Sequence, residues 1–210
     1  MQINAAEYDE IARGIFAPIY PVIAQQIKAK TGITSGTCMD IGCGGGYLGV
    51  ALARITKLSV YLFDESRDML GLAKQNIINE GLESRVQMME GDVHAIPIND
   101  QLIDLVISRG SIFFWENQPQ ALQEIYRVLA PGGIAYIGGG FGTPELKKQI
   151  DIQMTAQDPK WPEKVKQRMS RNNADKYREV LRQAEIPDFE VNQTDAGLWI
   201  IIRKVLWASC

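Results

Sequence analysis

The sequence predicts an α/β fold in which a mostly parallel sheet is covered by helices on both faces. Short apolar runs alternate with helical patterns along the first two thirds of the chain, as expected for repeated strand–helix–strand units. Glycines cluster directly after one predicted strand, at residues 42–49. Near the C-terminus, two strand patterns flank an Asp-Ala-Gly turn, which indicates an antiparallel pair at the end of the sheet.

The composition is that of a folded globular chain. The 210 residues are 46% hydrophobic and 22% charged, which excludes a disordered or collagen-like chain and fits one α/β domain. The formal net charge is −3, so the chain as a whole lacks the positive charge of a general polyanion binder. We therefore do not expect nucleic acid as a partner.

The cysteines and the N-terminus indicate a cytoplasmic protein. Cys38, Cys43 and Cys210 form an odd and sparse set, which is unlike a secreted disulfide framework and suits a reducing compartment. The first ten residues lack the basic and then apolar stretches of a signal peptide. The apolar runs are too short to span a bilayer, so we expect no membrane contact. We also expect a monomer or a homodimer.

The N-terminal segment has the pattern of an amphipathic helix over residues 8–29. Isoleucine recurs at every fourth position from Ile11 to Ile27, which places these side chains on one helical face. Pro18 and Pro21 are expected to kink or break this helix, because proline lacks the N–H donor of a helix interior.

Strands and helices alternate over the next part of the chain. Ser66 can cap a helix that Gly81 then ends. The expected elements are strand 37–41, helix 47–55, strand 58–63, helix 68–79, strand 86–89 and strand 103–108.

The remaining elements include the antiparallel pair. A helix over 119–129 is expected to end at Pro131-Gly132-Gly133, which is a strong turn signal. Strand 134–137 follows, and then residues 144–185 show helical patterns in one or two pieces broken near Pro159 and Pro162. The last expected elements are strands 189–194 and 198–205, which form the hairpin around Asp195-Ala196-Gly197.

The glycines after the first strand predict a ligand site. Such a junction lies at the carboxyl end of a parallel sheet, where ligands bind, and glycine lets a ligand approach the backbone. Two patterns fit. Gly44-x-Gly46-x-x-Gly49, with Asp64 twenty residues after Gly44, matches a dinucleotide fingerprint. The longer Asp40-x-Gly42-x-Gly44-x-Gly46 instead places an acid before alternate glycines.

The longer pattern resembles the first motif of the class I S-adenosylmethionine-dependent methyltransferases, of the small-molecule type. The resemblance runs in order over residues 38–139 and again over 189–205. Further matching features are Leu62-Phe63-Asp64-Glu65-Ser66, Met69, Gly91-Asp92-Val93, Pro97, the strand 104–109, Arg127-Val128-Leu129-Ala130-Pro131-Gly132-Gly133 and the terminal strand pair. The last two are not expected of a dinucleotide fold.

The resemblance implies a Rossmann-like, seven-stranded, mostly parallel sheet and S-adenosyl-L-methionine as cofactor, with S-adenosyl-L-homocysteine as product. In this family the glycine loop holds the methionine end, the acid after the second strand holds the ribose, and the acid after the third strand contacts adenine. The cofactor-binding residues that it implies here are Asp40, Gly42, Cys43, Gly44, Gly46, Asp64, Glu65, Met69, Asp92, Val93, Ser108 and Arg109.

Elementary chemistry agrees with this assignment. A nucleoside needs an acceptor for its two ribose hydroxyls, which Asp64 can supply. Its adenine needs an apolar slot and one acceptor, which Met69, Ile96 and Asp92 could form. Taken alone, Asp64 could instead cap a helix and Asp92 could start a turn, but together at strand ends they favour a ligand.

The acceptor side is less informative. Methyl transfer from a sulfonium is an in-line displacement that depends on alignment and exclusion of water, and many acceptors need no strong base. The catalytic candidates are Tyr20, Arg109 and Trp115, while core packing explains the aromatic ones equally well. His94, the one histidine, could face the adenine or serve only as a satisfied loop residue.

Several features remain open between a structural and a functional interpretation. Gly138–Gly142 could be a close backbone approach to substrate, a lid hinge or a simple loop exit. Residues 160–182 carry eight basic and three acidic side chains, either as a solvated face or as a lid in which Lys164, Lys166 and Arg168 attract an anionic substrate. We expect no metal site, because Cys38 and Cys43 lie on opposite faces of an extended strand.

The expected layout is a single methyltransferase domain over 1–210. It comprises an N-terminal helical cap (1–35), a cofactor-binding core (36–140), a helical segment that is a candidate lid (141–187) and the C-terminal strand pair (188–210). No separate target-recognition domain is visible and Ser108-Arg109-Gly110-Ser111 replaces the Asn/Asp-Pro-Pro-Tyr/Phe motif of nucleic-acid enzymes, which favours a small-molecule acceptor. The alternatives are an NAD(P)-dependent oxidoreductase and a non-catalytic S-adenosylmethionine-binding protein.

Overall fold

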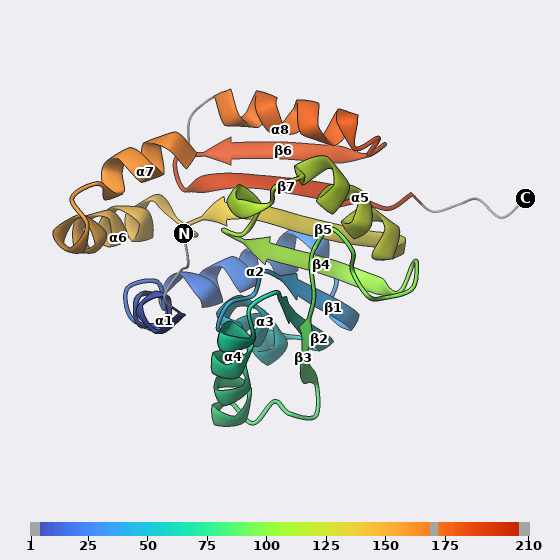
Figure 1. The fold of residues 1–210 in the computed structure, drawn as a ribbon, viewed down its shortest axis with the longest axis horizontal. Helices are drawn as coiled ribbons and strands as arrows, with labels where there is room; N and C mark the ends of the chain where they lie inside the picture. Colours follow the sequence, from blue (N-terminus) through green and yellow to red (C-terminus); the bar gives the residue numbers. More distant parts are fainter. Residues whose placement is uncertain (1–4, 169–171, 206–210) are drawn as a thin grey trace, which may run out of the picture.

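The structure is a computed structural model that describes residues 5–168 and 172–205. Its centre is a seven-stranded sheet in the order β3-β2-β1-β4-β5-β7-β6, drawn in Figure 1. Strands β1 to β5 run parallel to one another, and β7 is antiparallel to both β5 and β6. The predicted fold class, a mostly parallel sheet that ends in an antiparallel pair, is therefore confirmed.

Most elements agree with the sequence patterns to within two residues at each end. The strands are β1 (Ser35–Ile41), β2 (Lys57–Asp64), β3 (Val86–Glu90), β4 (Ile103–Arg109), β5 (Leu129–Gly140), β6 (Phe189–Thr194) and β7 (Gly197–Arg203). The helices between them are α3 (Tyr47–Ile55), α4 (Arg67–Asn79) and α5 (Gln118–Val128), with a short 3-10 turn η1 (Ile112–Phe114) before α5.

Alternation along the strands builds a core on each face of the sheet. Cys38 and Leu105 are buried against one helical layer, while their chain neighbours Met39 and Val106 are buried against the other. Successive side chains of a strand point to opposite faces, so a sheet covered on both sides reads as a nearly continuous apolar run. Figure 1 shows α5 in front of the sheet and α2 behind it.

The N-terminal segment forms two helices, α1 (Ala5–Arg13) and α2 (Ile19–Thr31). The predicted break is confirmed at Pro18, which occupies the N-cap of α2. Pro21 lies in the first turn of α2, where the missing N–H has no helical partner to lose. The isoleucine stripe continues across the break, since Ile19, Ile23 and Ile27 are fully buried in the core.

Strand β5 is longer than predicted, and the reason lies in Pro131-Gly132-Gly133. The expected turn is instead an irregularity within the strand, because Ile103 pairs with Leu129 while Leu105 pairs with Ile134. Gly132 has φ +80°, a conformation that favours glycine. The turn residues therefore bulge out of β5 and the chain then returns to the same neighbour.

The segment after the sheet core is helical, as predicted, wherever the structure describes a helix in it. It contains α6 (Pro144–Gln157), α7 (Trp161–Arg168) and α8 (Asn172–Gln183), where one or two pieces were expected. The first break lies beside Pro159, as predicted, whereas Pro162 fits in the first turn of α7. Residues 169–171, between α7 and α8, and the C-terminal positions that include Cys210 lie outside the described residues. No helix in the described ranges combines the length and the apolar character needed to cross a membrane.

The second glycine cluster has a packing explanation. A side chain at Gly138 would collide with the backbone oxygen of Leu198, and one at Gly139 would lie 2.8 Å from the Phe113 ring. A side chain at Gly140 would lie 3.0 Å from the Trp199 ring of β7. The interpretation of this cluster as a backbone approach to substrate is therefore corrected, because strand β7 and Phe113 occupy the space that the missing side chains leave.

The Gly138→Ala substitution should destabilise the fold by about 1–3 kcal/mol, because the new methyl group meets rigid backbone of β7 rather than a movable side chain. Urea unfolding followed by circular dichroism measures the change.

The matched control is Gly71→Ala in α4, where a new side chain meets nothing within 4 Å. This variant should be more stable than the parent chain by roughly 0.5–1 kcal/mol, because alanine has the higher helix propensity. Equal stability of the two variants would contradict the packing explanation.

Candidate functional site

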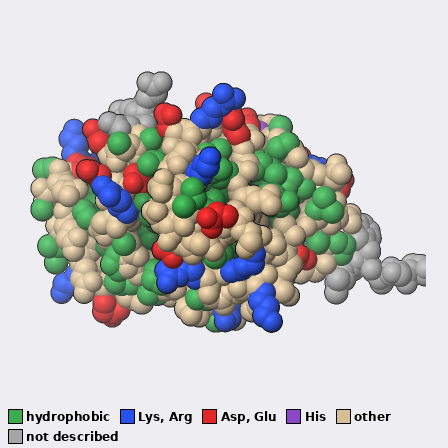
Figure 2. All heavy atoms as spheres, turned by 90° about the horizontal axis from the view of Figure 1, so that it is seen from below, with side chains coloured by type: hydrophobic (Ala, Val, Ile, Leu, Met, Phe, Trp, Pro, Cys, Tyr) green, Lys and Arg blue, Asp and Glu red, His purple; other side chains and the backbone are tan. Residues whose placement is uncertain are grey.

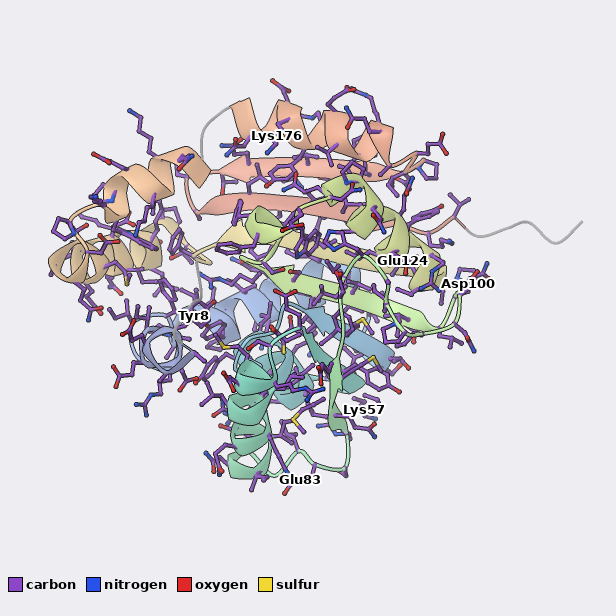
Figure 3. All side chains as sticks on the ribbon, in the orientation of Figure 1. Tyr8, Lys57, Glu83, Asp100, Glu124 and Lys176 are labelled. Carbon is purple, nitrogen blue, oxygen red and sulfur yellow. The ribbon has the colours of Figure 1, made fainter. Side chains whose placement is uncertain are left out.

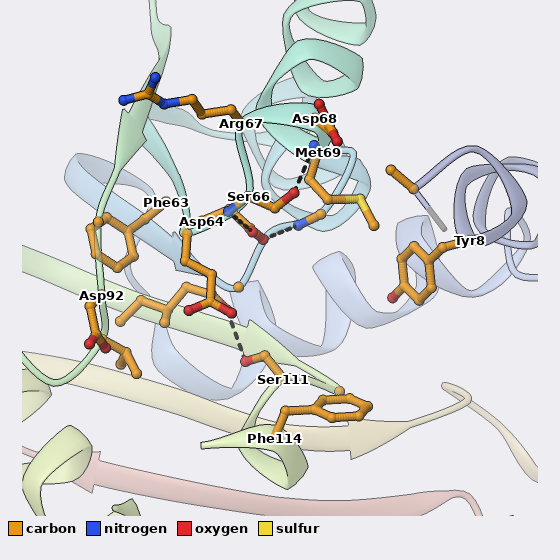
Figure 4. Close-up of a pocket in the computed structure, with 18 of the residues that line it drawn as sticks. Tyr8, Phe63, Asp64, Ser66, Arg67, Asp68, Met69, Asp92, Ser111 and Phe114 are labelled. Carbon is orange, nitrogen blue, oxygen red and sulfur yellow. Dashed lines mark hydrogen bonds between the residues drawn. The ribbon is translucent and has the colours of Figure 1, made fainter. Parts of the chain in front are cut away.

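A cavity of about 1370 Å³ lies at the carboxyl ends of the parallel strands. Its walls come from the segments that follow β1, β2, β3 and β4, and from the start of α1. Figure 4 shows Tyr8 and Asp92 on opposite sides of this cavity, and Met69 and Phe114 on the other two sides. The position is the one at which open parallel sheets bind their ligands.

The glycine loop forms one wall, and its backbone conformation requires glycine. Gly42 and Gly44 have φ values of +62° and +55°. A side chain at Gly42 would collide with Ser111, whereas Gly44 faces the cavity, with the nearest atom to its absent side chain on the Tyr8 ring at 3.4 Å. The backbone is therefore exposed to a ligand at Gly44 without a side chain in the way.

Asp64 joins this loop to the helix that follows. Its Oδ2 accepts a hydrogen bond from the Gly44 N–H at 2.8 Å, and its Oδ1 accepts one from the Ser66 N–H at 2.9 Å. Ser66 caps α4 through the N–H of Met69, as predicted. An ionised carboxylate can accept about four hydrogen bonds, so Asp64 keeps acceptor capacity toward the cavity.

Asp92 and His94 form the opposite end of the cavity. The Oδ1 atom of Asp92 accepts from the backbone N–H of His94 at 2.8 Å and lies 2.6 Å from His94 Nδ1. These bonds, first the one from the backbone N–H, lower the pKa of Asp92. The His94 Nε2 atom accepts from the Asn117 N–H at 3.2 Å, so the imidazole is a partner of the loop as well as a residue of the cavity wall.

Arg127 holds the loop that carries Asp92 and His94. Its guanidinium donates to the carbonyl oxygens of Ile96 and Ile98 and to the carboxylates of Glu124 and Asp100. Figure 3 labels Glu124 and Asp100 at one end of the sheet and Tyr8 toward the other. The hydrogen bonds from Arg127 lower the pKa of Glu124. Arg127, the first residue of the 127–133 signature, therefore does not line the cavity but holds the loop after β3 that does.

The end of β4 supplies the remaining wall. Arg109 lines the cavity, and its Nε donates to the Gly140 oxygen at 2.9 Å. The Ser111 hydroxyl donates to the Ile41 oxygen at 3.2 Å, which ties the turn after β4 to the end of β1. Trp115 lines the cavity while 9% exposed, and Phe114 lines it at 58% exposed.

Eight of the twelve predicted cofactor residues come together around this cavity, and four lie behind it. The eight are Gly42, Gly44, Asp64, Glu65, Met69, Asp92, Val93 and Arg109. Asp40 is buried and accepts a hydrogen bond from the Gly49 N–H at 2.8 Å. Cys43 and Gly46 support the loop from the core side, and the hydroxyl of buried Ser108 lies 2.6 Å from that of Ser111.

Of the three catalytic candidates, Arg109 and Trp115 reach the cavity wall and Tyr20 does not. The Tyr20 ring is buried and stacks on Tyr47 at 5.3 Å. Burial raises the pKa of the Tyr20 hydroxyl far above its usual range, despite the nearby Arg109 charge.

The sequence patterns did not single out several wall residues. Ala5 and Ala6 reach the cavity from the start of α1, which only the folding of the N-terminal segment over the sheet reveals. Leu72 follows Met69 by one helical turn on α4, so helical spacing could have indicated it. Gly110 has φ +84°, a backbone conformation that favours glycine, and open space beside it, so its residue type is the available sequence signal.

Among the basic side chains of residues 160–182 that the structure describes, none lines this cavity. Lys164 pairs with Asp158 at 2.7 Å. Lys166 lines a separate hollow between α6, α7 and the β6–β7 turn, and the side chain of Arg168 lies outside the described residues. The segment packs elsewhere, since Trp161 of α7 contacts the rings of Phe16 and Phe141.

Comparison with known proteins identifies the family. Residues 39–137 match the family described as "Methyltransferase domain". A solved structure of a proposed S-adenosyl-L-methionine-dependent methyltransferase from Methanococcus maripaludis is 43% identical, covers 100% of both chains and has a TM-score of 0.94. An uncharacterised methyltransferase of Bacillus subtilis (strain 168) is 30% identical over 70% of this chain and 82% of its own length.

A demethylmenaquinone methyltransferase of Lactobacillus johnsonii is 34% identical over 52% of this chain and 44% of its own length. For three such curated relatives, the chain spans only 40%, 44% and 53% of their length.

The chain therefore belongs to the methyltransferase domain family, within the class I S-adenosylmethionine-dependent methyltransferases. This confirms the family resemblance. The cofactor of that family is S-adenosyl-L-methionine, and its product is S-adenosyl-L-homocysteine.

The buried Asp40 carboxyl predicts a pH dependence of stability. Burial raises its pKa from 3.8 to about 7, although the Gly49 N–H opposes the shift. Between these two pH values the folded chain holds a proton that the unfolded chain releases, so the free energy of unfolding should fall as pH rises, by at most about 1.4 kcal/mol per pH unit.

The Asp40→Asn variant should lose this slope between pH 5 and 7.5, because the amide does not titrate and its oxygen can still accept from Gly49. Urea unfolding at several pH values measures the slope. Asp175→Asn, which alters an 83% exposed side chain, is the control and should keep it. An unchanged slope in Asp40→Asn would contradict the assignment.

Proposed function

We propose that this chain transfers the methyl group of S-adenosyl-L-methionine to a small-molecule acceptor by in-line displacement. The observation that carries the proposal is the size and position of the cavity. Its volume of about 1370 Å³ exceeds the ≈ 300–1,000 Å³ typical of pockets for one drug-sized ligand. A nucleoside donor and a small acceptor can therefore share it at the carboxyl edge of the sheet.

The residues present fit the donor at its ribose and its methionine end. Asp64 is oriented by two backbone N–H groups and retains acceptor capacity for two ribose hydroxyls. Gly44 leaves the loop backbone open to the methionine portion, and Gly42 lines the same wall. When bound, the donor supplies a sulfonium methyl group as the electrophile.

The opposite end of the cavity fits adenine. Met69 and Val93 line it with buried apolar surface. Both hydrogen bonds from His94 fall on Oδ1 of Asp92, which leaves Oδ2 as an acceptor for an exocyclic amine. Glu65 stands beside Asp64 at the rim and extends the acidic side of the ribose site. Asp40, Cys43, Gly46 and Ser108 would act from behind, by holding the loop and the strand end in place.

The chain's part in the reaction is alignment and exclusion of water. Tyr8, Phe114 and Trp115 line the cavity with aromatic surface, and Tyr8 lies beside Gly44 of the glycine loop. Such surface excludes water from a displacement that needs little proton transfer for amine, thiolate or carbanion acceptors.

A small acceptor is also supported by relatives and by charge. The demethylmenaquinone methyltransferase is named for a quinone substrate. On the face in Figure 2, basic and acidic side chains are interspersed and no continuous basic patch covers it. A nucleic acid partner would favour such a patch. We infer a cytoplasmic location from the sparse cysteines, as in the sequence analysis.

The family membership favours methyl transfer over a nicotinamide-dependent reaction. The experiment that tests the function is a small-molecule cell extract incubated with methyl-labelled donor, followed by mass analysis of labelled products. A labelled small molecule that requires the chain is the expected result. Binding of S-adenosylhomocysteine without any labelled product would instead indicate the non-catalytic alternative.

Asp64→Ala should weaken the affinity for S-adenosylhomocysteine by ~1–3 kcal/mol, because a charge-assisted hydrogen bond to the ribose is lost. Isothermal titration calorimetry measures the dissociation constant. Asp64→Asn keeps one acceptor for the loop N–H groups, so its affinity for S-adenosylhomocysteine should lie between those of Asp64→Ala and the parent chain.

Asp175→Ala, which removes the same charge on exposed α8, controls for net charge and should bind as the parent chain does. Unchanged affinity in Asp64→Ala would refute the ribose assignment.

A further inference from the structure

Arg109 differs from the other arginines whose side chains the structure describes. Seven of them form an ion pair with a carboxylate: Arg13, Arg54, Arg67, Arg127, Arg178, Arg182 and Arg203. Arg85 instead donates from both terminal nitrogens to three backbone oxygens. Arg109 forms one hydrogen bond, from Nε to the Gly140 oxygen, so within the described part of the chain its two Nη nitrogens have no protein partner.

The guanidinium is nevertheless held in one place. The Nε bond to Gly140 directs it toward β5, and its central carbon lies 5.0 Å from the Phe16 ring and 5.7 Å from the Tyr20 ring. Aromatic faces stabilise a cation but offer no hydrogen-bond acceptor comparable to a carboxylate. The Nη nitrogens therefore belong to a fixed, half-buried cation in the cavity wall.

A fixed cation of this kind favours a specific ligand chemistry. Removing a charge from water costs free energy unless it is paired and hydrogen-bonded. The planar guanidinium presents two parallel N–H donors, which match the two oxygens of a carboxylate or phosphate group. The wall acid Asp92 pairs with His94, and no ion pair joins Arg109 to a carboxylate of the described residues, so an anionic partner for this guanidinium would come from a ligand.

Position separates this cation from the donor's ribose and adenine sites. Asp64 ends β2 and Asp92 follows β3, on one side of the glycine loop after β1. Arg109 ends β4 and is anchored to β5, on the other side of that loop. The guanidinium thus lies toward the part of the cavity that the nucleoside leaves free.

We propose that the methyl acceptor is a small acid, and that the Nη nitrogens of Arg109 bind its carboxylate or phosphate oxyanion. This inference rests on the proposed methyltransferase function. It makes Arg109 a residue that determines acceptor specificity, with the aromatic rings of Phe16 and Tyr20 holding the guanidinium in place.

The experiment separates the acceptor by charge before the reaction. A small-molecule cell extract is divided on an anion exchanger into retained and unretained fractions, and each is incubated with the full chain and methyl-labelled donor. Labelled product is expected from the retained fraction. If labelled product forms only from the unretained fraction, the inference is overturned while methyl transfer is retained. If neither fraction gives labelled product, the proposed function itself is overturned.

Variants then assign the effect to Arg109. With the active retained fraction, Arg109→Gln should raise the apparent KM about 10- to 100-fold, the usual range for a lost hydrogen-bonded charge pair. Arg109→Lys keeps the positive charge but lacks the two parallel N–H donors, so its apparent KM should lie between those of the parent chain and Arg109→Gln. Arg54→Gln removes a charge that is paired with Glu80 outside the cavity, and should leave KM unchanged.

The donor also carries a carboxylate, and binding distinguishes the two sources. Calorimetry compares S-adenosylhomocysteine with 5′-methylthioadenosine, which lacks the carboxylate. The inference expects Arg109→Gln to bind both as the parent chain does, which also shows that the variant is folded. If Arg109→Gln loses affinity for S-adenosylhomocysteine but not for methylthioadenosine, the guanidinium binds the carboxylate of the donor and the inference is overturned.

Discussion

The Asp64 carboxylate is the interaction on which the candidate site depends. It accepts the Gly44 N–H with one oxygen and the Ser66 N–H with the other, so one side chain sets both the glycine loop after β1 and the start of α4. Backbone donors at such loop ends need partners when water is excluded. Because the same carboxylate keeps acceptor capacity toward the cavity, the group that organises the loop is also the one that can bind a nucleoside.

The other walls are fixed in a comparable way, each by a polar contact from a neighbouring helix or strand. Arg127 binds the loop after β3 through the oxygens of Ile96 and Ile98, and Gly140 at the end of β5 binds Arg109 at the end of β4. These contacts connect elements that are separated in the sequence but adjacent in the fold. The cavity is therefore a property of the sheet edge, where the carboxyl ends of parallel strands meet.

Much of the fold and part of the site could be predicted from local patterns. The helix Tyr47–Ile55 and the strand Phe189–Thr194 form at the predicted residues, since period and flanking turns define them. Asp64 and Asp92 could be predicted as cavity residues because they lie at the carboxyl ends of predicted parallel strands, where ligands bind. The bulge at Pro131-Gly132-Gly133 could not, because only pairing with β4 shows that the chain returns to one strand.

The sequence by itself determined the order of strands and helices, the glycine loop and the acidic residues that accompany it, because each of these is encoded over a few neighbouring residues. Only the tertiary structure decided which of those residues reach the cavity. It buried Asp40 beneath the loop and left the Arg109 guanidinium without a carboxylate partner. Burial and pairing depend on residues brought together from distant parts of the chain, and local sequence carries no record of that proximity.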